Sequence, residues 1–114
     1  LALDLLATRP RRRIAVLGDM LELGADAEAL HAHLGAQVAA RGIDFFFGFG
    51  PLMTHAVQAA AGAGLGARAR HFSTHDDLVD ALHHLAQPGD AVLVKGSRGS
   101  HMERVVAALA AGVA

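Results

Sequence analysis

The sequence predicts an α/β fold with a mainly parallel sheet, helices on both faces and four βα units. Short runs rich in β-forming residues alternate with longer helical stretches, a pattern typical of βαβ units. The runs IAVL and AVLV are apolar without alternation, as expected of strands that are covered on both faces. The connections are short, and we expect right-handed crossovers. This arrangement is Rossmann-like.

Four short runs are predicted to be strands: residues 13–17, 44–49, 70–72 and 90–94. The second run, DFFFGF, holds a cluster of three phenylalanines. Such a cluster indicates a buried strand, because aromatic platforms for nucleic acid bases would be exposed and close to basic residues.

Four helical stretches follow the strands: residues 25–41, 53–61, 76–86 and 100–111. In the first, Leu30, Leu34 and Val38 recur at four-residue spacing and are expected on one helix face. Gly42 stands just past this helix, where a helix stop belongs. The sequence STHDD before the third helix is typical of a capped N-terminus. The glycine- and alanine-rich residues 60–67 are expected to form a connection.

The length of 114 residues predicts a single domain, residues 1–114. The absence of cysteine excludes disulfide scaffolds, thiolate metal sites and cysteine nucleophiles. With 10 basic and 11 acidic residues, the chain gives no reason to expect nucleic acid as a partner. No targeting segment and no run of about 20 apolar residues occurs, so we expect a cytoplasmic protein without a membrane span. The chain begins inside an apolar helical pattern, which predicts a piece of a longer protein.

Two strand ends form the predicted site. The first strand runs into GDMLELG (residues 18–24), and the fourth runs into KGSRGS (residues 95–100). In the usual doubly wound order 3-2-1-4 these two strands are neighbours, and ligands bind outside the carboxyl ends where the crossover direction reverses. We therefore expect the two loops to lie side by side at a binding site.

The loop of residues 95–100 combines cations, hydroxyls and glycines between a strand and a helix. Glycines such as Gly96 allow close approach of the backbone to a ligand, and free N–H groups at a helix start favour an anion. Arg98 can hold a carboxylate or phosphate with two hydrogen bonds, and Lys95 is the only lysine of the chain. Ser97 and Ser100 supply the hydroxyls. The alternative is a glycine-rich turn with solvated charges, and the Walker A pattern GxxxxGK[ST] is absent.

The other loop places Asp19 and Glu22 after the first strand. These carboxylates could hold an ammonium group, orient Lys95 or Arg98, or assist a metal–nucleotide complex. The alternative is that Asp19 caps a turn and Glu22 is solvated.

Other polar clusters predict little chemistry. The eight histidines lack metal-ligand spacing, and no metal site is predicted. His31 follows Glu28 by three residues, which predicts a carboxylate–imidazole pair on the helix surface. The basic run of residues 9–13 is expected to be a solvated linker.

Three segments are specific when taken together: RRIAVLGDMLELG, then Glu28, His31 and Gly35 in the next helix, and finally GDAVLVKGSRGSHMERVV. They resemble the C-terminal domain of the Mur ligases, and the resemblance covers nearly the whole chain. It implies a three-domain, ATP-dependent ligase of peptidoglycan and cell-wall synthesis. In this family ATP phosphorylates a substrate carboxylate, and an incoming amine then attacks the acyl phosphate.

The resemblance implies distinct roles for the three domains. The first holds the UDP-sugar, and the central one carries the Walker A loop, most catalytic side chains and the magnesium sites. The third, Rossmann-like domain closes over the nucleotide and helps to bind the incoming amino acid or dipeptide. The motifs are most similar to those of the member that takes D-alanyl-D-alanine, which implies UDP-N-acetylmuramoyl-tripeptide and ATP as the other substrates.

The resemblance also implies roles for the loop residues. Lys95, Ser97 and Arg98 would face the dipeptide carboxylate or the phosphoryl region, where Lys95 and Gly96 would contact the nucleotide. Asp19 and Glu22 would form the opposite wall, and Ser100 is a further candidate.

The first two domains of the family, and the NANP-containing segment before its third, are missing from the sequence. The resemblance therefore implies that this chain folds but does not catalyse alone, with ATP and Mg²⁺ held mainly by the central domain. Two alternatives are open: a stand-alone Rossmann-like module that binds an anion or regulates another protein, and a purely structural or oligomerising domain.

Overall fold

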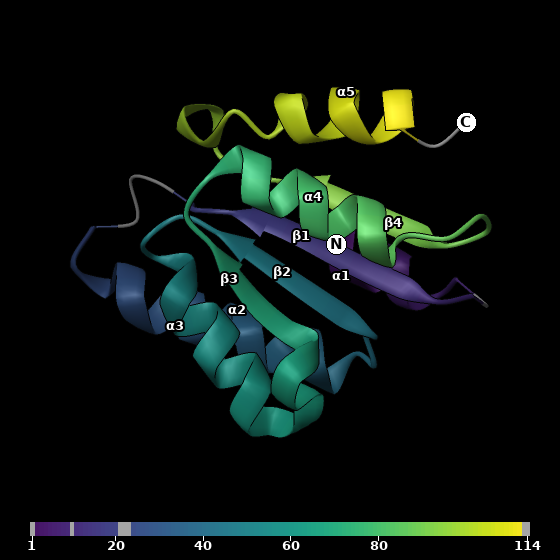
Figure 1. Cartoon of the computed structure of the whole chain (residues 1–114). Helices are drawn as coiled ribbons and strands as arrows, with labels where there is room; N and C mark the ends of the chain where they lie inside the picture. The colour runs from purple at the N-terminus through teal and green to yellow at the C-terminus, as the bar shows by residue number, and fades with distance from the viewer. Residues whose placement is uncertain (1, 10, 21–23, 113–114) are drawn as a thin grey trace.

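A computed structural model describes residues 2–9, 11–20 and 24–112 of the chain. Its strands form one parallel sheet in the order β3-β2-β1-β4 (Figure 1). They are β1 (Arg13–Gly18), β2 (Phe45–Phe49), β3 (Ala69–Phe72) and β4 (Ala91–Lys95). Each differs from its predicted run by at most one residue at either end. The predicted parallel sheet and its strand order are confirmed.

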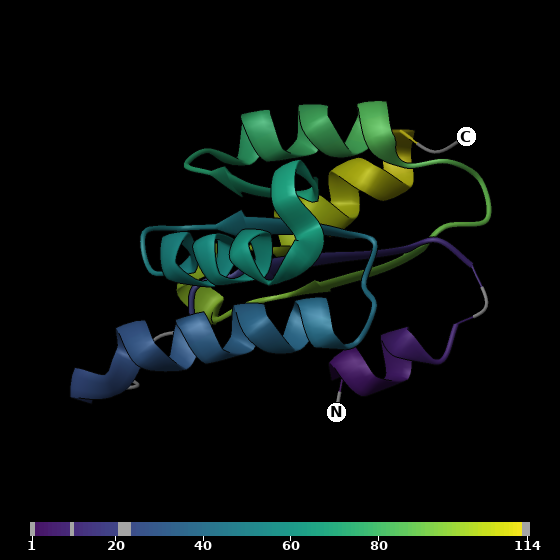
Figure 2. The ribbon, with the colours of Figure 1, turned by 90° about the horizontal axis from the view of Figure 1, so that it is seen from below.

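Helices cover both faces of the sheet, as predicted. The cluster on one face draws on α1 (Ala2–Ala7), α2 (Ala27–Ala40) and α3 (Met53–Ala60). The cluster on the other face draws on α4 (His75–Leu85) and α5 (Glu103–Gly112). Figure 2 shows α2 and α4 on opposite sides of the sheet.

Strand β1 supplies both halves of the core. Because side chains alternate along a strand, Ala15 and Leu17 pack toward the side of α2, while Ile14 and Val16 pack toward the side of α4. All four residues are buried. A strand that is covered on both faces therefore reads as the unbroken apolar run seen in the sequence.

Helix α2 buries a face that matches the predicted one only in part: Val38 and the partly buried Leu34 pack in the core as predicted, but Leu30 does not. His31, Gly35 and Val38 are buried, while Leu30 is 43% exposed. The physical reason is the close contact between α2 and α3: a Cβ atom added to Gly35 would lie 1.9 Å from the carbonyl oxygen of Ala56. The helix therefore presents Gly35, and not Leu30, to α3.

Three element boundaries also differ from expectation. Helix α2 is preceded by a 3₁₀ turn, Gly24–Asp26. The predicted connection of residues 60–67 contains a helical turn, Ala61–Leu65, that follows α3 directly, but the helix is broken at Gly64 (φ 128°) before the 3₁₀ turn Gly66–Arg68. The predicted helix of residues 100–111 begins only at Glu103, since the 3₁₀ turn Arg98–Ser100 and His101, at φ 50°, precede it.

The predicted cap before the helix of residues 76–86, which is α4, is confirmed. The N–H of Asp77 donates to Thr74 Oγ1 at 3.1 Å, and α4 starts at the next residue, His75. Asp76 and Asp77 lie in its first turn, where the helix dipole favours negative charge.

The basic run before β1 is not a solvated linker, and that prediction is wrong for its last two members. Arg12 donates from Nε and Nη2 to both carboxylate oxygens of Asp90 at 2.6–3.2 Å. Arg13 donates from Nη1 to the carbonyl oxygen of Ala7 at 2.6 Å. The Arg12–Asp90 pair thereby ties the start of β1 to the start of β4.

We expect Asp90→Asn to weaken the dependence of stability on acid pH. The hydrogen bond from Arg12 holds the pKa of the Asp90 carboxyl below its ordinary value, which is about 4. A lowered folded-state pKa contributes stability that is present above about pH 4 and is lost as the pH falls through the folded value. Urea unfolding between neutral pH and about pH 2 measures this loss. Asp80→Asn, at an exposed position on α4, is the control, and equal acid sensitivity in both variants would contradict the prediction.

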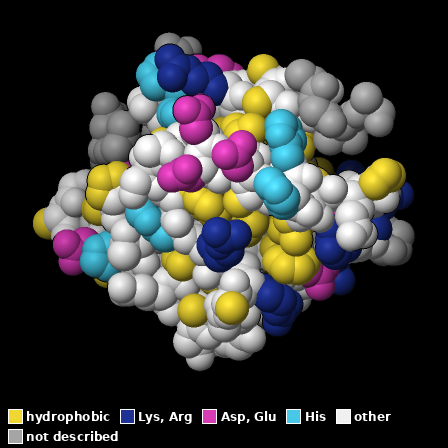
Figure 3. Space-filling view, viewed as in Figure 1, with side chains coloured by type: hydrophobic (Ala, Val, Ile, Leu, Met, Phe, Trp, Pro, Cys, Tyr) yellow, Lys and Arg dark blue, Asp and Glu magenta, His cyan; other side chains and the backbone are white. Residues whose placement is uncertain are grey.

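The surface carries charges of both signs. On the face seen in Figure 3, basic, acidic and histidine side chains are interspersed. On β3, the guanidinium of Arg70 lies over the rings of Phe47 and Phe72, at 5.7 and 5.0 Å from their centroids. Among the helices that the structure describes, none has the length and apolar character needed to cross a bilayer.

Candidate functional site

The carboxyl ends of β1 and β4 lie side by side, as the strand order predicts. Leu17 pairs with Lys95 in the parallel register. Beyond this pair the backbones are very close: a Cβ on Gly18 would lie 2.8 Å from the Ser100 Cβ, and one on Gly96 would lie 3.1 Å from the Gly18 Cα. Alanine at either position would displace its neighbours, so the two glycines permit this contact between the loops.

The backbone of Asp19 connects three strand ends. Its N–H donates to the carbonyl oxygen of Phe49, at the end of β2, at 3.0 Å. Its carbonyl oxygen accepts from the Ser97 N–H at 3.2 Å and from Ser100 Oγ at 3.3 Å, both in the loop after β4. The ends of β1, β2 and β4 are therefore joined at one residue.

The carboxylate of Asp19 caps helix α3. Its two oxygens accept from the N–H groups of Leu52 (3.1 Å) and Met53 (2.8 Å), and the residue is only 8% exposed. A negative charge at a helix N-terminus is favourable. Of the interpretations that the sequence leaves open, capping describes these contacts, although the capped element is α3 and not the turn of Asp19 itself.

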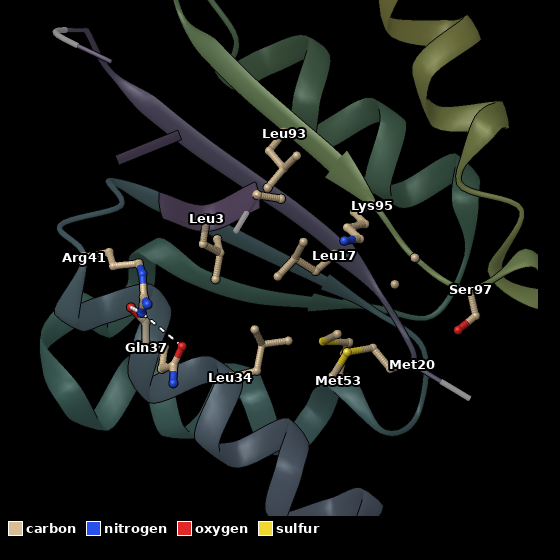
Figure 4. A pocket seen from close by; sticks show the side chains of 13 residues that line it. Leu3, Leu17, Met20, Leu34, Gln37, Arg41, Met53, Leu93, Lys95 and Ser97 are labelled. Carbon is tan, nitrogen blue, oxygen red and sulfur yellow. Dashed lines mark hydrogen bonds between the residues drawn. The ribbon is translucent and has the colours of Figure 1, made fainter. Parts of the chain in front are cut away.

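Lys95 and Ser97 border a cavity of about 320 Å³ that opens between α1, α2 and the ends of β1 and β4. Figure 4 shows both side chains at one end of it, and Gln37 and Arg41 at the other. Lys95 is exposed, and its ammonium has no hydrogen bond or ion pair within the part of the chain that the structure describes. A cation without a partner therefore stands at the rim.

The walls of this cavity are mainly apolar. Strands and helices contribute the apolar side chains Leu3, Leu17, Leu34, Met53 and Leu93. At the far end, Arg41 is already engaged, because Nε donates to Asp4 Oδ1 at 2.5 Å and Nη1 to Gln37 Oε1 at 3.0 Å. Among the described residues, the cations that line the cavity are Arg41 and Lys95, and of these Lys95 is the one without a described partner.

Sequence reasoning missed the contribution of α2 to this cavity. Leu34, Gln37 and Arg41 all line it, and they recur at spacings of three and four residues, which places them on one helix face. This spacing of polar and apolar residues on one helix face is the feature of the sequence that could have indicated their place in the cavity.

The remaining predicted residues are placed as follows. Gly96 lines the cavity, and Ser100 is buried with its hydroxyl on Asp19. Arg98 begins the 3₁₀ turn Arg98–Ser100. Its side chain, like the whole of Glu22, lies outside what the structure describes.

The expectation of free N–H groups at a helix start is wrong for two amides of this loop. The Ser97 N–H donates to Asp19, and the Ser100 N–H donates to the carbonyl oxygen of Ser97 at 2.9 Å. The reason is the intervening 3₁₀ turn, which closes its own hydrogen bond and delays α5 until Glu103.

His31 does not pair with Glu28, and the predicted surface pair is wrong. The imidazole is fully buried, and it contacts the Met20 N–H through Nε2 at 3.1 Å and the Ala27 carbonyl oxygen through Nδ1 at 2.7 Å. Glu28 instead lies 3.9 Å from the Nε2 atom of His55. The spacing of three residues correctly predicts that both residues lie on one helix, but it does not predict the direction in which the His31 ring points.

A second histidine supports the loop after β4 and was not singled out from the sequence. His75 Nε2 lies 2.7 Å from the Ser100 carbonyl oxygen, where an Nε2–H donates. Its ring lies against that of Phe49, with centroids 4.4 Å apart. From the start of α4, its ring thus links the end of β2 to the loop after β4.

Within residues 2–9, 11–20 and 24–112, no three or more histidine, aspartate or glutamate side chains form a group that could hold a metal ion. The carboxylate at the end of β1 has both oxygens on backbone N–H groups. The described residues therefore do not fit a magnesium site.

Comparison with known proteins gives concordant matches. The family described as "Mur ligase, glutamate ligase domain" matches residues 1–98. The UDP-N-acetylmuramoyl-tripeptide–D-alanyl-D-alanine ligase of Escherichia coli is 41% identical over 110 residues, which cover 95% of this chain and 23% of that protein.

Solved structures agree. The chain is similar to MurF from Acinetobacter baumannii, with a TM-score of 0.82, 30% identity, and coverage of 95% of this chain and 24% of that one. It shares the fold of MurF ligase from Thermotoga maritima, solved in complex with ADP, with a TM-score of 0.78, 23% identity, and coverage of 97% and 24%. The chain thus spans about a quarter of the length of these relatives.

Proposed function

Because the chain belongs to the Mur ligase family, as its glutamate ligase domain, we propose that it is the substrate-binding domain of a ligase that joins D-alanyl-D-alanine to UDP-N-acetylmuramoyl-tripeptide. The observation that carries the proposal is the Lys95 ammonium, which has no partner among the described residues, at the rim of a largely apolar cavity. A cation beside apolar walls suits a small ligand that has a carboxylate and methyl side chains. Both substrates are those in the name of the Escherichia coli relative.

In the proposed reaction, the tripeptide carboxylate takes the γ-phosphoryl group of ATP and ADP leaves. The dipeptide amine then attacks the resulting acyl phosphate and loses a proton. The new amide bond forms as the carbon–oxygen bond to phosphate breaks, and inorganic phosphate leaves. This domain would hold and orient the dipeptide, which makes the attack effectively unimolecular. The cation of Lys95 would also stabilise negative charge on the carboxylate or the phosphoryl group.

The roles of the other loop residues follow from their places. Ser97 lines the same cavity end as Lys95, so its hydroxyl is a candidate partner of the dipeptide carboxylate. Gly96 lines the same cavity, so it is a candidate contact for the phosphoryl region of the nucleotide. Arg98 and Glu22 are proposed from the sequence resemblance alone. Asp19 and Ser100 would act by holding the two loops together.

In the proposed enzyme, magnesium would be bound by other domains and not by this one. The described residues do not fit a magnesium site, and no step of the reaction is assigned to a metal in this domain. ATP would be held mainly by the central domain that the family resemblance implies, with Lys95 and Gly96 at its edge.

We expect Lys95→Met to weaken binding of D-alanyl-D-alanine by about 10- to 100-fold, because a hydrogen bond to a charged group contributes about 1.5–3 kcal/mol. Isothermal titration of the chain with the dipeptide measures this change. Lys95→Arg retains the charge and should bind more tightly than Lys95→Met. Arg11→Met removes an exposed cation at the opposite end of β1 and should leave binding unchanged.

A parallel titration with ADP separates the two sites that are open for Lys95. Loss of dipeptide affinity alone assigns Lys95 to the carboxylate, and loss of ADP affinity alone assigns it to the phosphoryl region. Equal affinities of wild type and Lys95→Met for both ligands would refute the role of Lys95.

A further inference from the structure

His31 is a fully buried imidazole that reaches the site loop from α2. Both ring nitrogens have backbone partners: the Met20 N–H for Nε2, at 3.1 Å, and the Ala27 carbonyl oxygen for Nδ1, at 2.7 Å. Met20 follows Asp19 directly and is the second residue beyond the end of β1. The ring thus contacts the loop at the point where it leaves the sheet.

These partners define the protonation state of the ring. A carbonyl oxygen can only accept, so Nδ1 carries a proton and donates to Ala27. The Met20 N–H can only donate, so Nε2 must offer its lone pair. The two contacts together require the neutral Nδ1–H tautomer, because the other tautomer and the imidazolium both place a proton on Nε2, against the Met20 N–H.

Helix α2, which carries His31, is itself held close to α3. One turn further along α2, Gly35 contacts Ala56 of α3 so closely that no Cβ fits between them. The start of α3 is in turn hydrogen-bonded to the Asp19 carboxylate through Leu52 and Met53. Asp19 is therefore hydrogen-bonded to the start of α3, and Met20 is hydrogen-bonded to His31 of α2. These two helices also pack on one another.

Met20 is a wall of the cavity next to Lys95. Figure 4 shows its side chain beside Met53, at the same end of the cavity as Lys95 and Ser97. A displacement of the Met20 backbone would therefore change the shape of the cavity at its cationic end.

We propose that His31 is a positioning residue, which in its neutral Nδ1–H form holds Met20 against α2 and thereby sets the cavity wall at the end where Lys95 lies. Its contribution to dipeptide binding rests on the proposed function. The tautomer and the hold on Met20 do not, because they follow from the contacts of the ring itself.

The first test needs no substitution. Long-range ¹H–¹⁵N correlation spectra of the ¹⁵N-labelled chain report the protonation of each imidazole nitrogen. For His31 we expect a protonated Nδ1 and an unprotonated Nε2 at neutral pH. A protonated Nε2 would overturn the proposal, whatever the chain binds.

The second test compares variants of His31. In His31→Phe, which retains a ring but offers no acceptor, amide exchange at Met20 should accelerate by about tenfold or more, and dipeptide affinity should fall. His31→Gln restores an acceptor and should recover much of both. His84→Phe, at an exposed position on α4, which packs on the other face of the sheet, is the matched control and should change neither.

The outcomes separate the two proposals. Unchanged Met20 exchange in a folded His31→Phe chain would refute the positioning role, as would failure of His31→Gln to restore Met20 protection where it folds. If the wild-type chain shows the expected tautomer and Met20 protection but no affinity for the dipeptide, the proposed function fails at this site while the positioning of Met20 stands.

Discussion

Gly35→Ala is expected to lower the free energy of unfolding by about 3 kcal/mol or more, at the upper end of the range for overpacking. The new Cβ would lie 1.9 Å from the carbonyl oxygen of Ala56 and 2.8 Å from its Cα. These are backbone atoms of α3, so no rotamer change relieves the clash, and the two helices must separate. Total stabilities of domains are about 5–15 kcal/mol, so such a loss is large. Urea unfolding followed by circular dichroism measures it.

Gly62→Ala is the matched control for this substitution. No atom lies within 4 Å of a Cβ built at Gly62, and the residue is not among the glycines with positive φ. Alanine there should be neutral or stabilise by about 0.4–1 kcal/mol, since it restricts the unfolded chain. A Gly35→Ala chain as stable as Gly62→Ala would show that α2 and α3 do not depend on this contact.

Asp19→Ala is expected to cost about 2–4 kcal/mol, because it removes a helix cap and leaves the N–H groups of Leu52 and Met53 without an acceptor. The site is buried, so water does not replace the lost carboxylate freely. Asp19→Asn keeps one acceptor oxygen and should lose less. Denaturant unfolding gives the total effect, and amide exchange at Met53 reports the cap itself.

The control for Asp19 is another aspartate beside a helix. Asp26 stands at the N-cap position of α2, but its side chain makes no capping hydrogen bond, and it is exposed. Asp26→Ala should change stability by less than about 0.5 kcal/mol. If the two alanine variants were equally stable, the Asp19 carboxylate would not be the cap of α3.

The fold was largely predictable because its signals are local. Runs such as IAVL mark strands that are covered on both faces, and the alternation with helices gives a parallel sheet. The strand order then brought Lys95 and Asp19 together without any knowledge of contacts. The family resemblance agreed with this site and added the chemistry.

What escaped prediction depends on which atoms meet across elements. The apolar stripe of α2 pointed to Leu30, but the contact between Gly35 and Ala56 turned the helix toward His31. The spacing of Glu28 and His31 suggested a local pair, whereas the ring found a partner 11 residues back in the chain. The partner of the Asp19 carboxylate likewise lies more than 30 residues away, beyond the reach of any local pattern.

The hydrogen bonds at Asp19 also affect how much conformational entropy the protein would lose when a ligand binds. The loops after β1 and β4 are already hydrogen-bonded to one another through the Asp19 carbonyl oxygen, so a ligand bound at Lys95, as proposed, would meet a backbone that is already ordered at Asp19 and Ser97. Immobilising one flexible side chain costs about 0.5–1.5 kcal/mol. For a dipeptide bound here, the entropy lost by the protein would come mainly from Lys95, and the larger share would be the dipeptide's own.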